Sequence, residues 1–137
     1  LAFDLEASLN FEGNSGPYLQ YTYARANRML FDAGKYKRLT KEQLAKLLTH
    51  ESELELLRSF YMFSEVVIDA TKTLSPNILT SYLFDLAQKF NSFYKQQPIL
   101  KEEDSDTQAA RLTLTQASAK ILQKGLYLLG IKTVERM

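Results

Sequence analysis

The side chains that most often carry out catalysis are sparse and scattered in this sequence. The only histidine, His50, lies among polar residues at a predicted helix junction, and no cysteine is present to join it as a metal ligand or nucleophile. Glu51, Glu53 and Glu55 alternate along the chain, so on a helix they point in different directions and do not form an acid–base pair. We therefore interpret His50 as an ordinary surface residue and predict no catalytic residue and no metal site in this chain.

A glycine-containing run, Gly13–Pro17, opens a predicted helix, as phosphate-binding loops do. It lacks the lysine of a nucleotide-binding loop and follows no predicted strand. A turn is therefore a better interpretation of this run than an ATP site.

Tyrosine and arginine side chains offer a different chemistry, the binding of an unpaired base. An exposed aromatic ring beside an arginine is a stacking surface for a base in a single-stranded RNA loop. Tyr21, with Arg25 one helical turn later, has this character, and so does Tyr94 beside Lys95 at the end of its predicted helix. Packing in the core is the ordinary role of an aromatic residue, and it stays open as the alternative.

The composition indicates one folded domain. A chain of 137 residues is long enough for its own core, since a folded domain of about 150 residues buries about 68–70% of its unfolded surface. The absence of cysteine fits a reducing cytoplasm, and no apolar stretch approaches the roughly 20 residues that cross a bilayer. We expect a soluble, cytoplasmic protein. The start at Leu1–Asp4, without methionine or the layout of a signal peptide, suggests a fragment of something longer.

Charge is unevenly distributed along the chain, although the formal net charge is only +1. Residues 25–46 contain seven basic and two acidic residues, and residues 111–137 contain five basic residues and one acidic residue. If these two segments meet in space, they would form one positive face that suits a polyanion. Ordinary solvated helix faces are the alternative interpretation.

Helical periodicity and capping patterns predict an all-α bundle of about five main helices, and no segment alternates as a strand would. Within the third helix, two neighbouring apolar stripes predict burial on two sides. The predicted helices run from Pro17 to Gly34, over about ten residues after the Thr40–Gln43 capping box, from about Ser52 to Thr73, from Pro76 to Pro98, and from a Ser105–Gln108 cap to Gly130.

The sequence contains three phrases that the packing of helices does not require. In chain order they are Phe11–Tyr21, Phe90–Tyr94 and Val134–Met137. The first, followed by Ala24 and Arg25, is similar to a Glu-Gly-Asp-Thr-Gly-Pro-Tyr-Leu/Val-Gln-Tyr run, and the second to a Phe-Asn-x-Phe-Tyr phrase. The third is similar to a terminal Glu-Arg-Met. Together they resemble the C-terminal, DALR-type anticodon-binding domain of arginyl-tRNA synthetases, which are class I enzymes.

The departures from the family pattern are mild. Asn14 stands where aspartate is usual, Ser15 where threonine is, Tyr23 where histidine is frequent, and Val134 where proline is common. The histidine-containing signature and the lysine-serine loop of class I catalytic domains are absent. The resemblance therefore implies that aminoacylation, with its ATP and Mg²⁺, belongs to a missing N-terminal part.

The resemblance also implies a domain organisation and a partner. Residues 1–16 would be a segment leading from the missing catalytic domain, and residues 17–137 would be the helical anticodon-binding domain. The partners would be arginine tRNA, through its anticodon loop, and the catalytic domain of the same chain. A monomer without membrane contact is expected.

Arginine codons share a central G, so every arginine tRNA carries a cytosine at the centre of its anticodon. By the family's pattern, the pocket for this base would be formed by Tyr21 and Tyr94 flanking or stacking on it, Arg25 stacking or holding phosphate, and Met137 shaping the rim. Weaker candidates for contacts with the RNA backbone are Arg28, Lys120, Lys124 and Arg136. The alternatives are a helical protein-interaction module and the anticodon-binding domain of another class I synthetase.

Overall fold

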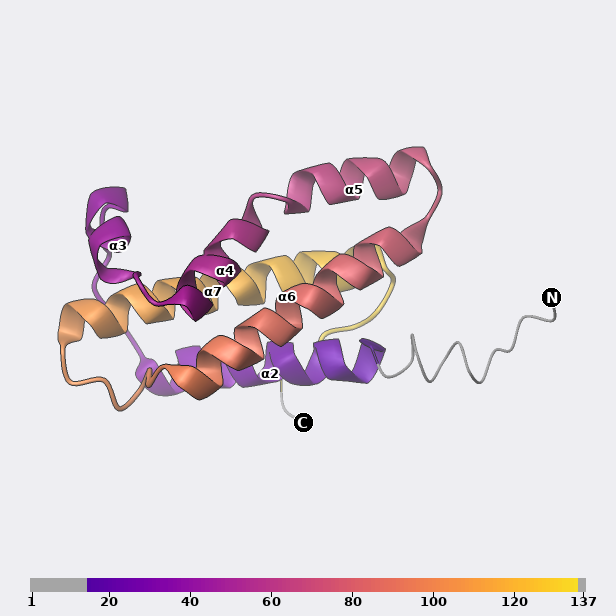
Figure 1. Ribbon diagram of the computed structural model, residues 1–137. Helices are drawn as coiled ribbons and strands as arrows, with labels where there is room; N and C mark the ends of the chain where they lie inside the picture. The colour runs from indigo at the N-terminus through magenta and orange to yellow at the C-terminus, as the bar shows by residue number, and fades with distance from the viewer. Residues whose placement is uncertain (1–14, 136–137) are drawn as a thin grey trace.

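A computed structural model of the chain describes residues 15–135, and within that range the fold contains helices and no strands (Figure 1). The prediction of an all-α bundle is confirmed. The predicted N-terminal segment, residues 1–16, lies almost entirely outside the described residues, as do Arg136 and Met137. The helices are α2 (Ser15–Ala33), α3 (Lys41–Leu47), α4 (Glu51–Phe60), α5 (Phe63–Lys72), α6 (Pro76–Gln96) and α7 (Ser105–Leu128).

Helices α2, α6 and α7 pack against one another and form the centre of the bundle. In Figure 1, α6 crosses α7, with α2 on one side of this pair and α5 on the other. Helix α4 covers both α6 and α7, whereas α5 packs on α6 and α3 on α7. Gly125 of α7 is buried at a close contact with α6. A Cβ atom at this position would collide with the side chain of Leu83, so the contact depends on glycine.

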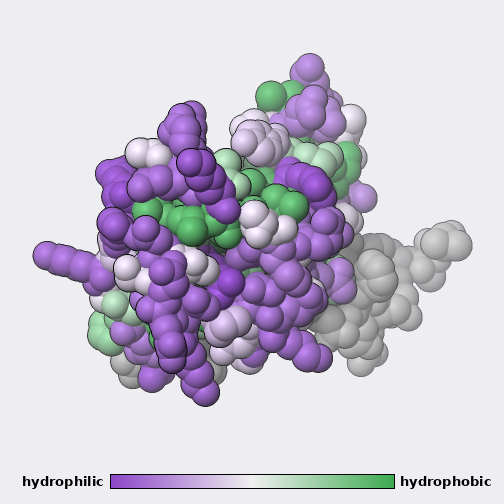
Figure 2. Space-filling model, turned by 60° about the vertical axis from the view of Figure 1, so that its left-hand side comes forward, coloured by the Kyte–Doolittle hydropathy of each residue, from purple (hydrophilic) through white to green (hydrophobic). Residues whose placement is uncertain are grey.

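The core is filled by the apolar faces of these helices. Leu19 of α2, Phe90 and Phe93 of α6 and Leu122 of α7 are completely buried. Figure 2 shows one face of the molecule, on which hydrophilic side chains surround a narrower band of apolar ones. No helix within residues 15–135 has the length and apolar character that crossing a membrane requires.

Glycine ends two of the helices, as the sequence predicts. Gly34 follows α2 with φ +66°, and Gly130 follows α7 with φ +75°, a left-handed conformation that costs glycine little. The start of α2 differs from the prediction, because the helix begins at Ser15 and Pro17 is its third residue. Proline is tolerated there because N–H groups in the first turn have no partner within the helix.

The capping box at Thr40 and Gln43 is confirmed, although α3 has seven residues rather than about ten. The observed cap of α7 lies one residue before the predicted one. Asp104, not Ser105, is the cap, and its carboxylate accepts hydrogen bonds from the N–H and the hydroxyl of Thr107 at 2.9 and 2.8 Å. These bonds lower the pKa of Asp104, because they favour its charged form.

The predicted single helix over residues 52–73 is wrong, because the chain breaks into α4 and α5 at residues 61–62. In an unbroken helix, the carbonyl of Ser59 would accept a hydrogen bond from the N–H of Phe63. Here this carbonyl accepts from the Tyr82 hydroxyl of α6 at 2.7 Å and from the N–H of Met62 at 3.2 Å. The predicted burial on two sides is only partly found, because Tyr61 is 83% exposed and Ile68 is 50% exposed.

A buried ion pair joins α4 to α7. The Glu53 carboxylate is almost completely buried and accepts from Arg111 Nε at 3.1 Å and from the N–H of His50 at 3.0 Å. Arg111 Nη1 also donates to the carbonyl of Pro98 at 2.7 Å and to Glu102 at 2.9 Å. One guanidinium therefore holds together α4, α7 and the loop between α6 and α7.

We expect Tyr82→Phe to lower the free energy of unfolding by about 1 kcal/mol, because it removes the hydrogen bond to Ser59. Burial, followed by the charge of Asp85, raises the pKa of Tyr82 from 10.0 to about 12. The folded state therefore favours the protonated hydroxyl, and this stabilisation is complete below pH 10 and is lost between about pH 10 and 12. Urea unfolding across this range should show the difference between the two proteins shrinking, and a constant difference would contradict the assignment.

We expect Glu53→Gln to lower the free energy of unfolding by about 3 kcal/mol, because it removes one charge of a buried pair. The control is Glu51→Gln in the same helix, where the ion pair with Arg58 at 3.1 Å is exposed and contributes less than about 1 kcal/mol. Chemical denaturation of both variants measures the contrast. Equal losses would show that the buried pair is no more important than the exposed one.

Candidate nucleic-acid interface

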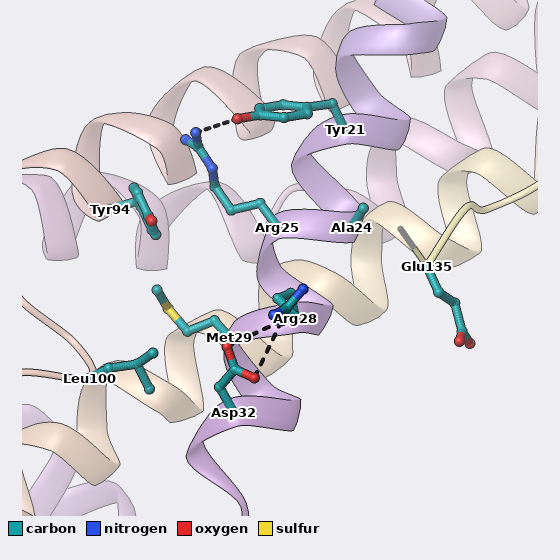
Figure 3. Close-up of a pocket in the computed structure, with 9 residues that line it drawn as sticks. All are labelled: Tyr21, Ala24, Arg25, Arg28, Met29, Asp32, Tyr94, Leu100 and Glu135. Carbon is teal, nitrogen blue, oxygen red and sulfur yellow. Dashed lines mark hydrogen bonds and ion pairs between the residues drawn. The ribbon is translucent and has the colours of Figure 1, made fainter. Parts of the chain in front are cut away.

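The structure brings Tyr21, Arg25 and Tyr94 together in one pocket, although α2 and α6 are far apart in the sequence (Figure 3). The pocket has a volume of about 480 Å³. Its wall is mixed, with aromatic, charged and apolar side chains from α2, from the end of α6, from the following loop and from the segment after α7. The lining residues are Tyr21, Ala24, Arg25, Arg28, Met29, Asp32, Tyr94, Leu100 and Glu135.

Arg25 lies against both tyrosine rings. Its guanidinium carbon is 4.8 Å from the centre of the Tyr21 ring and 4.4 Å from that of the Tyr94 ring. Nη2 also donates to the Tyr21 hydroxyl at 2.6 Å (Figure 3). Both rings keep access to solvent, with 42% of Tyr21 and 37% of Tyr94 exposed. The three side chains thus form a preassembled group of flat, stackable surfaces.

Helix geometry explains why these side chains face outward. Tyr21 and Arg25 are four residues apart and share one face of α2, as the sequence predicts, while Leu19 and Tyr23 of the same helix are buried. On α6, the buried rings of Phe90 and Phe93 fix the helix to the core. Tyr94 lies one turn after Phe90, with the two ring centres 6.4 Å apart, so it lies at the edge of the core with one side open to solvent.

One residue of the pocket's support was not identified from the sequence. Asn91 belongs to the Phe90–Tyr94 phrase, whose predicted binding residue is Tyr94 alone. Its Oδ1 accepts a hydrogen bond from Arg25 Nη1 at 3.0 Å, and its Nδ2 donates to the hydroxyls of Tyr18 and Thr22, both at 2.9 Å. The sequence feature that could have indicated this role is an asparagine between the aromatic residues Phe90 and Phe93 of one predicted helix.

The two basic segments meet, because α2 packs against α7, but they do not form an unbroken positive face. Several of their cations are already paired with carboxylates. Lys37 contacts Asp106 at 2.8 Å, and this hydrogen bond raises the pKa of Lys37. Arg28, which lines the pocket, is paired with Asp32 at 3.2 Å. The pocket therefore contains carboxylates as well as arginines.

The other predicted cations lie elsewhere or outside the described range. Lys120 and Lys124 are exposed on α7, and neither lines the Arg25 pocket. Lys124 instead lines an apolar groove of about 590 Å³ between α5 and α7, together with Ile68 and Tyr127. Neither lysine is therefore grouped with the predicted base-binding residues.

Met137 and Arg136 lie outside the described residues, so their predicted contributions have no structural counterpart here. The preceding segment does approach the site. Gln20 Nε2 donates to the carbonyl of Lys132 at 2.8 Å, which ties this segment to α2, and Glu135 lines the pocket.

Comparisons with known proteins agree with the fold and with the family resemblance. The arginine–tRNA ligase of Clostridium beijerinckii is 40% identical over 137 residues, which are 100% of this chain and 24% of that ligase. The ligase of Shewanella putrefaciens is 41% identical over 138 residues, covering 98% of this chain and 23% of its own length. The chain thus spans about a quarter of the length of these curated relatives.

A solved structure supports the same relationship. The arginyl-tRNA synthetase of Thermus thermophilus superposes with a TM-score of 0.79 and 32% sequence identity, covering 89% of this chain and 21% of that one. The family model for the DALR anticodon binding domain matches residues 19–137. The resemblance inferred from the sequence is confirmed, and this chain belongs to the family of DALR anticodon-binding domains.

Proposed function

We propose that this chain is the anticodon-binding part of an arginine–tRNA ligase, and that the pocket between α2 and α6 receives the central cytosine of the arginine anticodon. The observation that carries the proposal is the position of Arg25 against two exposed tyrosine rings, in a chain of this family. A base that enters the pocket gains stacking contacts with these side chains, each aromatic contact being worth about 1–3 kcal/mol.

The guanidinium of Arg25 also has hydrogen-bonding capacity left for a ligand. An arginine side chain carries five N–H groups, and bonds to Asn91 and Tyr21 use two of them. The remaining groups are donors only, so they suit the acceptors of an unpaired cytosine, which are its carbonyl oxygen and one ring nitrogen, or the oxygens of a phosphate. Met29 and Leu100 provide an apolar part of the wall, against which a base loses little by leaving water.

Other parts of the tRNA would contact residues around the pocket. Arg28 is the candidate nearest to the base, and Lys120, Lys124 and Arg136 would neutralise backbone phosphates further away. We propose that Met137 shapes the rim, since Glu135 lines the pocket two residues earlier. These contacts would fix the position of the loop, whereas the base pocket would supply the selectivity.

The remaining assignments concern the longer polypeptide that the relatives' names and lengths indicate. Arginylation, with its ATP and Mg²⁺, would take place in a catalytic domain of the same longer polypeptide, acting in the cytoplasm as a monomer. Both curated relatives described above are arginine–tRNA ligases, which favours this ligase over another class I synthetase.

A binding comparison tests the proposal. We expect the 137-residue chain to bind an arginine anticodon stem-loop more tightly than a copy in which only the central cytosine is replaced, because the pocket is assigned to that base. Fluorescence anisotropy measures both affinities on one scale. Low salt is used because it strengthens weak contacts with phosphates. Equal affinities would contradict the cytosine pocket, and absence of binding to either loop would favour a protein-interaction module.

We expect Tyr94→Ala to weaken binding of the arginine stem-loop about 5- to 150-fold, which corresponds to the loss of one stacked base contact of about 1–3 kcal/mol. Tyr94 is partly exposed, so circular dichroism and the melting temperature should change little. Tyr127→Ala is the matched control, since this tyrosine is 80% exposed and lines a different groove. Unchanged affinity of a folded Tyr94 variant would remove the residue from the pocket.

A further inference from the structure

We infer that Asn91 is a positioning residue, which holds the Arg25 guanidinium between the rings of Tyr21 and Tyr94 before any nucleic acid arrives. This inference rests on the proposed function, because it concerns how the same pocket is kept ready for a base. The carboxamide of Asn91 is the hydrogen-bonded link between α2 and α6 at this point, with Oδ1 only 3.0 Å from Arg25 Nη1.

The surrounding hydroxyls determine which way the carboxamide faces. The Thr22 hydroxyl is completely buried and donates its single hydrogen to the carbonyl of Tyr18 at 2.8 Å. It can therefore only accept from Asn91, at 2.9 Å, which requires the Nδ2 end of the amide to face it. The Tyr18 hydroxyl accepts the second Nδ2 hydrogen at 2.9 Å. Both donors of Asn91 are thus used on α2, and its only acceptor, Oδ1, is directed at Arg25.

This fixed acceptor reduces the freedom of a long side chain. An unrestrained arginine loses side-chain entropy when it is immobilised. Asn91 lies on a helix that the buried rings of Phe90 and Phe93 anchor in the core, so packing fixes its backbone position. Arg25 is consequently ordered during folding, and the nucleic acid does not have to order it on binding.

The neutrality of the amide matters as well. A carboxylate at position 91 would also accept from Arg25, but it would form an ion pair and cancel the positive charge that faces the pocket. The carboxamide orients the guanidinium and leaves its full charge available to a polyanion. The structure therefore assigns two properties to residue 91: an acceptor directed at Arg25 and the absence of a negative charge.

A double-mutant cycle on the 137-residue chain tests whether Asn91 acts through Arg25. With the arginine anticodon stem-loop as probe, we expect Asn91→Leu to weaken binding about tenfold in the natural chain and to have no further effect in an Arg25→Ala background. The control is Ser92→Ala, an exposed neighbour on the same helix that should leave the affinity unchanged. An equal loss from Asn91→Leu in both backgrounds would overturn the inference.

A second measurement needs no nucleic acid, so its failure is distinct from failure of the proposed function. In the free protein, the two rings should shift the NMR signals of the Arg25 side-chain protons upfield, because these protons lie over aromatic faces. We expect Asn91→Leu to abolish the shift and Ser92→Ala to retain it. A retained shift in Asn91→Leu would overturn the inference even if the stem-loop binds. If the shift is abolished but the natural chain binds no stem-loop, the positioning role holds and the proposed function fails.

Asn91→Asp preserves the acceptor toward Arg25, although it loses the two donors to Tyr18 and Thr22, and it provides the result if the leucine variant does not fold. We expect it to retain the upfield shift, while the affinity for the stem-loop falls and depends less steeply on salt concentration, because the new carboxylate neutralises Arg25. An affinity and a salt dependence equal to those of the natural chain would contradict the role assigned to the neutral amide.

Discussion

The packing of one face of α2 against both α6 and α7 is the constraint on which the rest of the structure depends. Leu19, Tyr23 and Ala26 are buried on this face, so the side chains at Tyr21 and Arg25 must point outward. The same contact sets the distance between α2 and the end of α6, where Tyr94 emerges. The pocket is therefore a direct consequence of core packing and does not depend on a flexible loop for its aromatic and cationic groups.

Much of this arrangement could be predicted from the sequence, because it follows from local rules. The faces of α2, the glycine stops at Gly34 and Gly130, and the capping box at Thr40 each depend on residues within a few positions of one another. Three of the predicted site residues, Tyr21, Arg25 and Tyr94, do converge. Their convergence was predicted through resemblance to a family, since spacing alone does not show that α2 and the end of α6 are adjacent.

The features that could not be predicted depend on partners distant in the sequence. At the break between α4 and α5, the Ser59 carbonyl accepts a hydrogen bond from the Tyr82 hydroxyl of α6, and nothing in residues 52–73 indicates that partner. The supporting role of Asn91 likewise depends on hydroxyls of α2 that lie about 70 residues away. Similarly, Arg111 counts as a free cation in the sequence, but its pairing with Glu53 makes it a structural residue. The role of a charged or polar side chain therefore depends on the partner that the fold places beside it.

The polar interactions of this domain divide into two groups with different requirements. The Glu53–Arg111 pair combines opposite charges in a buried setting, where an unpaired charge would be costly, so its partners neutralise each other. The pocket group instead joins a cation to neutral acceptors, Asn91 and Tyr21, and so keeps a net positive charge near solvent. A site that attracts a polyanion must leave its arginine uncompensated, and it can do so here because Arg25 is only partly buried. The buried ion pair and the pocket thus use separate arginines, Arg111 and Arg25.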